Sequence, residues 1–191
     1  MTRLRLLVWR AWASLWLVLG RRDRAEATFE RMVRAFPDAR YPLASRAHLH
    51  AQARRYDAAL ADYEQLLARH PNDASGWFNQ GFVLESLGRD EDALASFRRA
   101  TAIDPTLDRA WYGQGLVLIR LRRFDDAVEA LKRNTELQPM SPYGWYQLAR
   151  VHVDRREPDE AVRIIRHLRG FEPKVAAQLE RETGLLTGEP A

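Results

Sequence analysis

The sequence contains no cysteine and only two lysines, Lys132 and Lys174. Without cysteine the chain can form neither a disulfide nor a thiolate-ligated metal site. Its 30 basic residues are therefore almost all arginine, and they exceed the 26 acidic residues by only four. The sequence pI is about 9.7, but so small a surplus of positive charge does not favour nucleic acid as a partner.

Groups of catalytic or metal-binding residues are also missing from the sequence. The five histidines include no pair four residues apart, which is the spacing of a helical zinc site. His48 and His50 are two residues apart and would point in different directions on a helix. Gly113 and Gly115 fall inside an expected helix, where packing explains them better than phosphate binding. We therefore expect no enzymatic activity, no cofactor and no metal.

The sequence does have an internal repeat of 34 residues. In the best-defined copy, residues 74–107, the pattern runs from Trp77 to Pro105, and the same residue types return 34 residues later at Trp111 and Pro139. A fixed period of this length is typical of stacked-repeat proteins. The prolines at this spacing are Pro37, Pro71, Pro105, Pro139 and Pro173.

This pattern resembles the tetratricopeptide repeat (TPR), a helix–turn–helix unit of about 34 residues. The resemblance implies an all-α fold, a right-handed α-solenoid of antiparallel helix pairs (TPR superhelix) that forms one domain over residues 1–191. The apolar residues after Pro173 predict a short C-terminal capping helix over about 176–186. The second unit departs most from the pattern, because Leu43 replaces the tryptophan. The five expected units are residues 6–39, 40–73, 74–107, 108–141 and 142–175.

Each unit is expected to turn between its two helices at a fixed position. Gly88 can adopt the left-handed conformation that ends a helix there. Arg54 and Arg122 hold the same position in other units, so a positive φ at this position is not guaranteed. Arginines just after this position could attract anionic partners, but neighbouring acids favour a solvated turn. These acids meet the positive end of the second helix of each unit; they are Asp23, Asp57, Glu91, Asp125 and Asp159.

We predict that the first helices of the units line a concave groove. The fourth and eighth positions of a unit pack inward, which leaves the second, fifth, sixth, ninth and twelfth facing the groove. In residues 40–73 this face includes Tyr41, Ala44, Ser45 and His48. Rigid aromatic rings offer large contact area, and amide side chains can bind a peptide backbone. The predicted partner-binding residues are Phe78, Asn79, Phe82, Arg109, Tyr112, Leu116, Tyr143, Tyr146, Gln147 and Arg150.

The start of the chain is a dense apolar run from Leu4 to Leu19 that is interrupted by few polar residues, chiefly Arg10 and Ser14. It is shorter than the about 20 residues that span a bilayer, and the repeat pattern makes it the first helix of the first unit. No preceding repeat covers this helix, so we expect its apolar surface to dock onto a second copy, a protein partner or a membrane surface. The predicted docking patch is Trp9, Trp12 and Trp16.

The resemblance implies a non-catalytic scaffold or adaptor that binds a protein or peptide partner in its groove. Some tetratricopeptide domains hold a carboxylate terminus with a clamp of basic residues and asparagines, but only Asn79 and Arg109 match that pattern here. The alternative hypothesis is a membrane-associated assembly factor that docks through the tryptophan-rich first helix. We expect a cytoplasmic location under the first hypothesis and a location peripheral to the membrane under the second.

Overall fold

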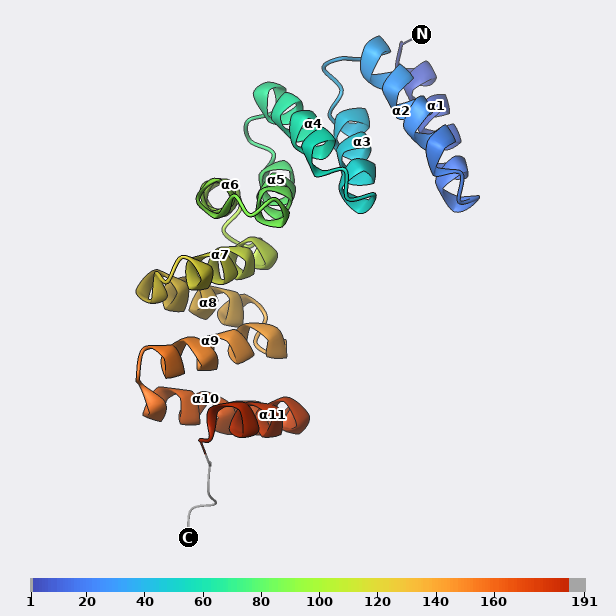
Figure 1. Cartoon of the computed structure of the whole chain (residues 1–191). Coiled ribbons are helices and arrows are strands. Elements are labelled where there is room, and N and C mark those ends of the chain that lie inside the picture. The colour runs from blue at the N-terminus through green and yellow to red at the C-terminus, as the bar shows by residue number, and fades with distance from the viewer. Residues whose placement is uncertain (1, 186–191) are drawn as a thin grey trace. The chain divides into compact units, whose positions relative to one another are not determined.

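The computed structural model describes residues 2–185, with side chains from Leu4 onward. This part of the chain forms eleven α-helices and no strand, which confirms the predicted all-α fold (Figure 1). It divides into two compact parts, an N-terminal part up to Arg89 and a C-terminal part from Asp90. The division falls in the turn between the two helices of the third repeat, and the expectation of one domain stays a prediction.

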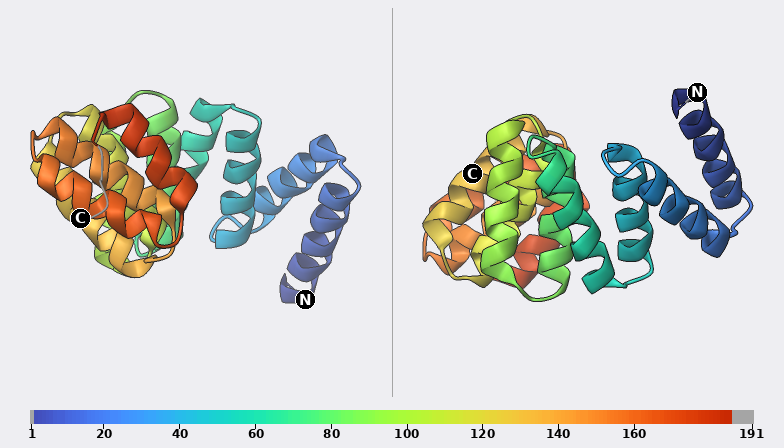
Figure 2. Two further views of the ribbon diagram at one scale, coloured as in Figure 1. Left: turned by 90° about the horizontal axis from the view of Figure 1, so that it is seen from below. Right: turned by 90° about the horizontal axis from the view of Figure 1, so that it is seen from above.

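The N-terminal part contains two helix pairs and the first helix of the third repeat. Each helix packs against the next one in the chain, and the third helix also contacts the fifth, so the first helices of successive repeats adjoin there. Figure 2 shows each helix turning back against its predecessor. The helices are α1 (Thr2–Val18), α2 (Arg22–Ala35), α3 (Arg40–Gln52), α4 (Tyr56–Arg69) and α5 (Ala74–Ser86).

The C-terminal part continues the same pattern and ends in a cap. Its last helix packs on both preceding helices, where the first helix of a further repeat would lie. This predicted cap starts earlier than expected because Pro173 suits the first turn of a helix. It ends at Gly184 with a φ of 70°, and Leu186 lies outside the described residues. The helices are α6 (Asp90–Ile103), α7 (Asp108–Arg120), α8 (Phe124–Leu137), α9 (Pro142–Asp154), α10 (Pro158–Arg169) and α11 (Pro173–Thr183).

The turn inside each repeat has one conformation throughout, whichever residue occupies it. The residue after the turn residue donates its backbone N–H to the carbonyl of the residue five positions before the donor. In the third repeat this bond runs from Arg89, which follows Gly88, to Leu84 at 2.9 Å. This geometry requires a left-handed residue, so arginine adopts a positive φ in three repeats, an angle that glycine adopts with less strain. The turn residues and angles are Gly20 (69°), Arg54 (57°), Gly88 (72°), Arg122 (58°) and Arg156 (62°).

Small residues let the two helices of a repeat approach closely. A Cβ atom at Gly115 would lie 2.6 Å from side-chain atoms of Leu131, so only glycine fits where α7 meets α8. Tryptophan joins successive repeats by a second recurring contact, in which its indole N–H donates to the carbonyl of the preceding proline. The pairs are Trp77 with Pro71 (2.8 Å), Trp111 with Pro105 (3.0 Å) and Trp145 with Pro139 (2.9 Å).

A partly buried charged cluster joins the first two repeats, where Leu43 cannot make the tryptophan contact. Arg46 on α3 pairs with Asp62 on α4 at 2.6 Å. The ring nitrogens of His50 lie 3.1 Å from a Glu26 oxygen and 3.2 Å from an Asp62 oxygen. Arg55 binds Glu26 at 2.5 Å, and this hydrogen bond is the main reason that the pKa of Glu26 is lowered. The cluster therefore connects α2, α3 and α4 through side chains.

Candidate partner-binding surface

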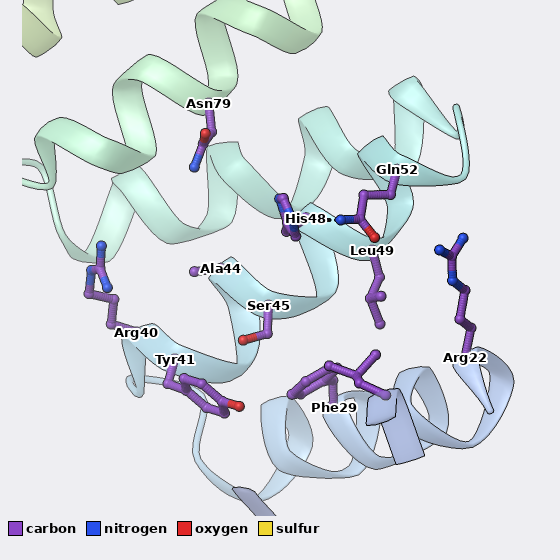
Figure 3. A pocket seen from close by; sticks show the side chains of 11 residues that line it. Arg22, Phe29, Arg40, Tyr41, Ala44, Ser45, His48, Leu49, Gln52 and Asn79 are labelled. Atoms are coloured by element: carbon purple, nitrogen blue, oxygen red, sulfur yellow. Dashed lines mark hydrogen bonds between the residues drawn. The ribbon is translucent and has the colours of Figure 1, made fainter. Parts of the chain in front are cut away.

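The first helices of the N-terminal part line a pocket of about 580 Å³. Its floor is apolar, because Phe29 and Leu49 are buried there. Figure 3 shows Tyr41, Ser45 and His48 along α3 beside this space, with Asn79 reaching toward it from α5. The pocket therefore brings together positions that the repeat pattern assigned to a groove.

Two arginines border this pocket, one in an ion pair and one outside any ion pair with the described residues. Arg40 forms two hydrogen bonds with Asp73, one of them 2.8 Å between Nη2 and Oδ1. The bond to Asp73 raises the pKa of Arg40. Burial alone would raise the pKa of Asp73, but hydrogen bonds from Arg40 and from the Gly76 N–H outweigh it and lower that pKa. Arg22 is exposed and forms no ion pair with the described residues, so it is free to meet a ligand.

A second pocket of about 420 Å³ continues the same face of the N-terminal part toward α5. Its lining includes the predicted residues Phe78, Asn79 and Phe82, and the side chain of Phe82 is 49% exposed. Tyr63 closes it from α4, and burial, with the charges of two nearby aspartates, raises the pKa of Tyr63 to about 12. Both pockets share three lining residues, so together they form a continuous trough; these are His48, Gln52 and Asn79.

The C-terminal part has its own pocket of about 310 Å³ on the same face of its repeats. Three tyrosines and one amide that the sequence predicted line it, and α11 supplies Val175 and Gln178 as the opposite wall. The hydroxyl of Tyr146 donates to Glu182 of α11 at 2.5 Å, which raises the pKa of Tyr146 and lowers that of Glu182. The predicted residues in this pocket are Tyr112, Tyr143, Tyr146 and Gln147.

Three predicted residues lie on the first helices but outside these pockets. Arg109 is exposed on α7, and Leu116 is half-buried on the same helix. Arg150 is exposed on α9, with its guanidinium carbon 5.8 Å from the centre of the Tyr146 ring. A role for these residues in binding stays a prediction.

The cap α11 contributes residues to the C-terminal pocket that the sequence analysis did not predict. Val175 and Gln178 form one wall of the C-terminal pocket, although α11 was expected only to cover the last repeat. Because α11 takes the place of a further first helix, the same positional rule could have indicated that it lines the groove. Phe29 and Leu49 were missed for another reason: they are core residues, 0% and 7% exposed, that lie beneath the trough.

The three tryptophans of the predicted docking patch do not share one face of α1. Trp9 and Trp16 are half-buried against the cluster of Ala13, Phe29 and other core residues that joins α1 to its neighbours. Trp12 points outward and is 49% exposed, with its ring stacked beside that of Trp16 at 5.8 Å. The docking role of this helix stays a prediction, and its exposed surface includes Trp12 and several apolar residues around it.

Antiparallel helix pairs with a 34-residue period, a common turn and adjoining first helices define a stacked helical-hairpin repeat protein. The sequence model of the tetratricopeptide repeat matches residues 44–108 and 109–170, which together are more than half of the chain. The chain therefore belongs to the tetratricopeptide repeat family. Proteins of this family are generally interaction modules without catalytic activity.

Solved structures of the same fold resemble the chain at low sequence identity. MamA from Desulfovibrio magneticus RS-1 is 21% identical with a TM-score of 0.77, over 92% of this chain and 94% of that chain. YrrB, described as a TPR protein with an unusual peptide-binding site, is 17% identical with a TM-score of 0.78, over 91% and 90%. TTC0263, a TPR protein from Thermus thermophilus, is 23% identical with a TM-score of 0.63, over 92% and 97%. The sequence matches no curated protein.

Proposed function

We propose that this protein is a non-catalytic interaction scaffold that holds a segment of a partner protein against the first helices of its repeats. The observation that carries the proposal is the trough of the N-terminal part, where predicted groove positions of α3 and α5 surround adjoining pockets. The larger pocket, about 580 Å³, falls within the size range of ligand sites in proteins. The description of YrrB as a peptide-binding TPR protein adds a precedent in the same fold.

The chemistry of the trough suggests what the partner segment presents. Phe29 and Leu49 form an apolar floor that favours an aliphatic or aromatic anchor side chain. The amide of Asn79 makes no hydrogen bond with the described residues, so it can bind the backbone of the segment. Arg22 on the rim can pair with an acidic side chain near the anchor. We therefore expect a segment with one large apolar residue and a nearby aspartate or glutamate.

The pocket of the C-terminal part offers a second, smaller anchor position. Its tyrosines provide aromatic surface, and the amide of Gln147 makes no hydrogen bond with the described residues. Tyr146 is less available as a donor, because its hydroxyl is bound to Glu182. This pocket is therefore expected to contribute ring contacts and one amide contact to binding.

Binding can be tested with peptides selected on the full-length protein from a random display library. We expect Tyr41→Ala and Asn79→Ala each to weaken the selected peptides about tenfold, because each removes a direct contact. Met140→Ala is the control, since Met140 is exposed yet lines none of the three pockets. Helicity is checked by circular dichroism. Selected peptides that bind both trough variants and Tyr143→Ala as tightly as the original protein would contradict the proposal.

A further inference from the structure

One helix carries most of the exposed apolar surface of the described residues. Of the eleven large hydrophobic side chains that are exposed, eight lie between Leu4 and Leu19. All of these except Leu17, which lines the trough pocket, recur at helical spacing on α1 and at the residue that follows it, and so form a stripe along one side of the helix. The opposite side of α1 packs into the core through Ala13 and its neighbours. The stripe consists of Leu4, Leu7, Val8, Trp12, Leu15, Val18 and Leu19.

Positive charge gathers at the same end of the chain. Residues 1–22 contain five arginines and no acidic residue, whereas the rest of the sequence has 25 basic and 26 acidic residues. The net charge of +4 therefore comes entirely from the apolar helix and its turn. The guanidinium group of Arg5 lies over the Trp9 ring, and that of Arg10 lies over the Tyr41 ring. By helical spacing Arg5 lies next to the stripe, between Leu4 and Val8, whereas Arg10 lies on the side of α1 that faces Tyr41.

The middle of the stripe corresponds to a surface that other repeats bury. In those repeats the second helix of the preceding repeat covers it: a Cβ at Gly76 would touch Leu67 of α4, and Gln114 donates to Thr101 of α6. Val8, Trp12 and Leu15 hold the same positions in α1 and are 46%, 49% and 44% exposed. The corresponding residues, all of them buried except the half-buried Arg46, are Pro42, Arg46, Leu49, Gly76, Gln80, Val83, Ala110, Gln114, Val117, Gly144, Leu148 and Val151.

The ends of the stripe correspond to positions that no helix covers elsewhere in the described chain. Leu4 is 70% exposed and Val18 is 84% exposed. Their counterparts are less buried than the middle positions and, with one exception, polar. A helix docked in place of a preceding repeat would bury the middle of the stripe and leave its ends in water. A flat apolar medium would bury the whole stripe. The counterparts are Asp38, Asn72, Thr106, Met140, Gln52, Ser86, Arg120 and Asp154.

We propose that α1 binds the surface of an anionic lipid bilayer, with the stripe buried among acyl chains and the arginines at the lipid headgroups. Apolar side chains, an exposed tryptophan and flanking arginines are the features of a helix that lies in a membrane interface. No described helix is both long and apolar enough to cross a membrane. The helix lies along the bilayer surface, and the scaffold is held there through its first repeat.

The proposal is tested with the full-length protein and two kinds of vesicle, pure phosphatidylcholine and phosphatidylcholine mixed equally with phosphatidylglycerol. We expect flotation with the anionic vesicles, weakened by added salt. The double variant Leu4→Ser/Val18→Ser should lower the partition coefficient by about tenfold or more. Leu4→Ser alone should weaken binding, while Met140→Ser should not, although Met140 is 68% exposed.

Two further measurements test whether the arginines of residues 1–22 contribute to binding and whether Trp12 faces the bilayer. The pair Arg5→Gln/Arg21→Gln should weaken binding about fivefold for each arginine, while Arg156→Gln/Arg166→Gln, at exposed sites elsewhere, should lose much less. Brominated lipids should quench tryptophan fluorescence in the original protein and much less in Trp12→Phe. Absence of flotation with anionic vesicles would overturn the proposal. A dimer that Trp12→Ser disrupts but Leu4→Ser/Val18→Ser preserves would instead assign the stripe to a protein contact.

Discussion

The outer faces of the first and last described helices, α1 and α11, differ in character. Each helix is a terminal element with no further repeat beside it within residues 2–185. The cap α11 buries Ala176 and Leu179 and leaves Lys174 and Arg181 exposed, as terminal repeats of soluble solenoids do. The opening helix α1 instead exposes a continuous apolar stripe. One end is therefore covered by polar side chains of its own, whereas at the other end we propose that a bilayer surface buries the exposed stripe.

The largest effect that separates the two ends should come from shortening a leucine in each helix. Leu179→Ala in α11 should lower the free energy of unfolding by about 3 kcal/mol, because its side chain is fully buried. Leu15→Ala in α1 should cost less than about 1 kcal/mol, since Leu15 is 44% exposed. Urea unfolding followed by circular dichroism measures both. Equal costs at the two positions would mean that the stripe of α1 is covered in the isolated protein.

A smaller effect should distinguish the turns of the first and last repeats. Gly20→Ala should lower the free energy of unfolding by about 1 kcal/mol, because Gly20 has a φ of 69° and an added Cβ would meet no other atom. Arg156→Gly should instead raise it by about 0.5 kcal/mol, since it relieves a positive φ of 62°. Thermal unfolding of the two variants provides the comparison. If both changes shift stability in the same direction, the turns do not share one conformation.

A further modest effect should be a pH dependence of stability that arises in the N-terminal part. The pKa of Asp73 is lowered in the folded protein, so its contribution is complete above its ordinary pKa of 3.8 and is lost as the pH falls through the lower folded value. Because Arg40 is half exposed, the contribution should not exceed about 1 kcal/mol. Stability of Asp73→Asn and of the original protein should therefore converge as the pH falls well below 3.8. A gap that widens on acidification would contradict this assignment.

Local sequence patterns predicted most of the fold and part of the candidate surface. The period predicted the helix pairs, and three residues that the positional rule assigned to the groove line a pocket, namely Tyr41, His48 and Asn79. The tryptophans of α1 show the limit of such patterns, because helical spacing alone did not separate inward-facing Trp9 from outward-facing Trp12.

Contacts between residues distant in sequence could not be predicted in this way. The link from Glu26 to Arg55 depends on side-chain geometry between two helix pairs. The same holds for the wall that Gln178 adds to the C-terminal pocket. The positive φ of Arg122 could not be predicted for a related reason. The hydrogen bonding of the whole turn imposes an angle that arginine alone would avoid.

The central claim is that a partner segment is held by the first helices of the repeats. Hydrogen–deuterium exchange of the full-length protein, with and without a peptide selected on it, tests this most directly. Binding should slow exchange in α3 and α5, or in α7 and α9, and leave α4 and α8 unchanged. Protection confined to the second helices, or to α1 alone, would contradict the claim.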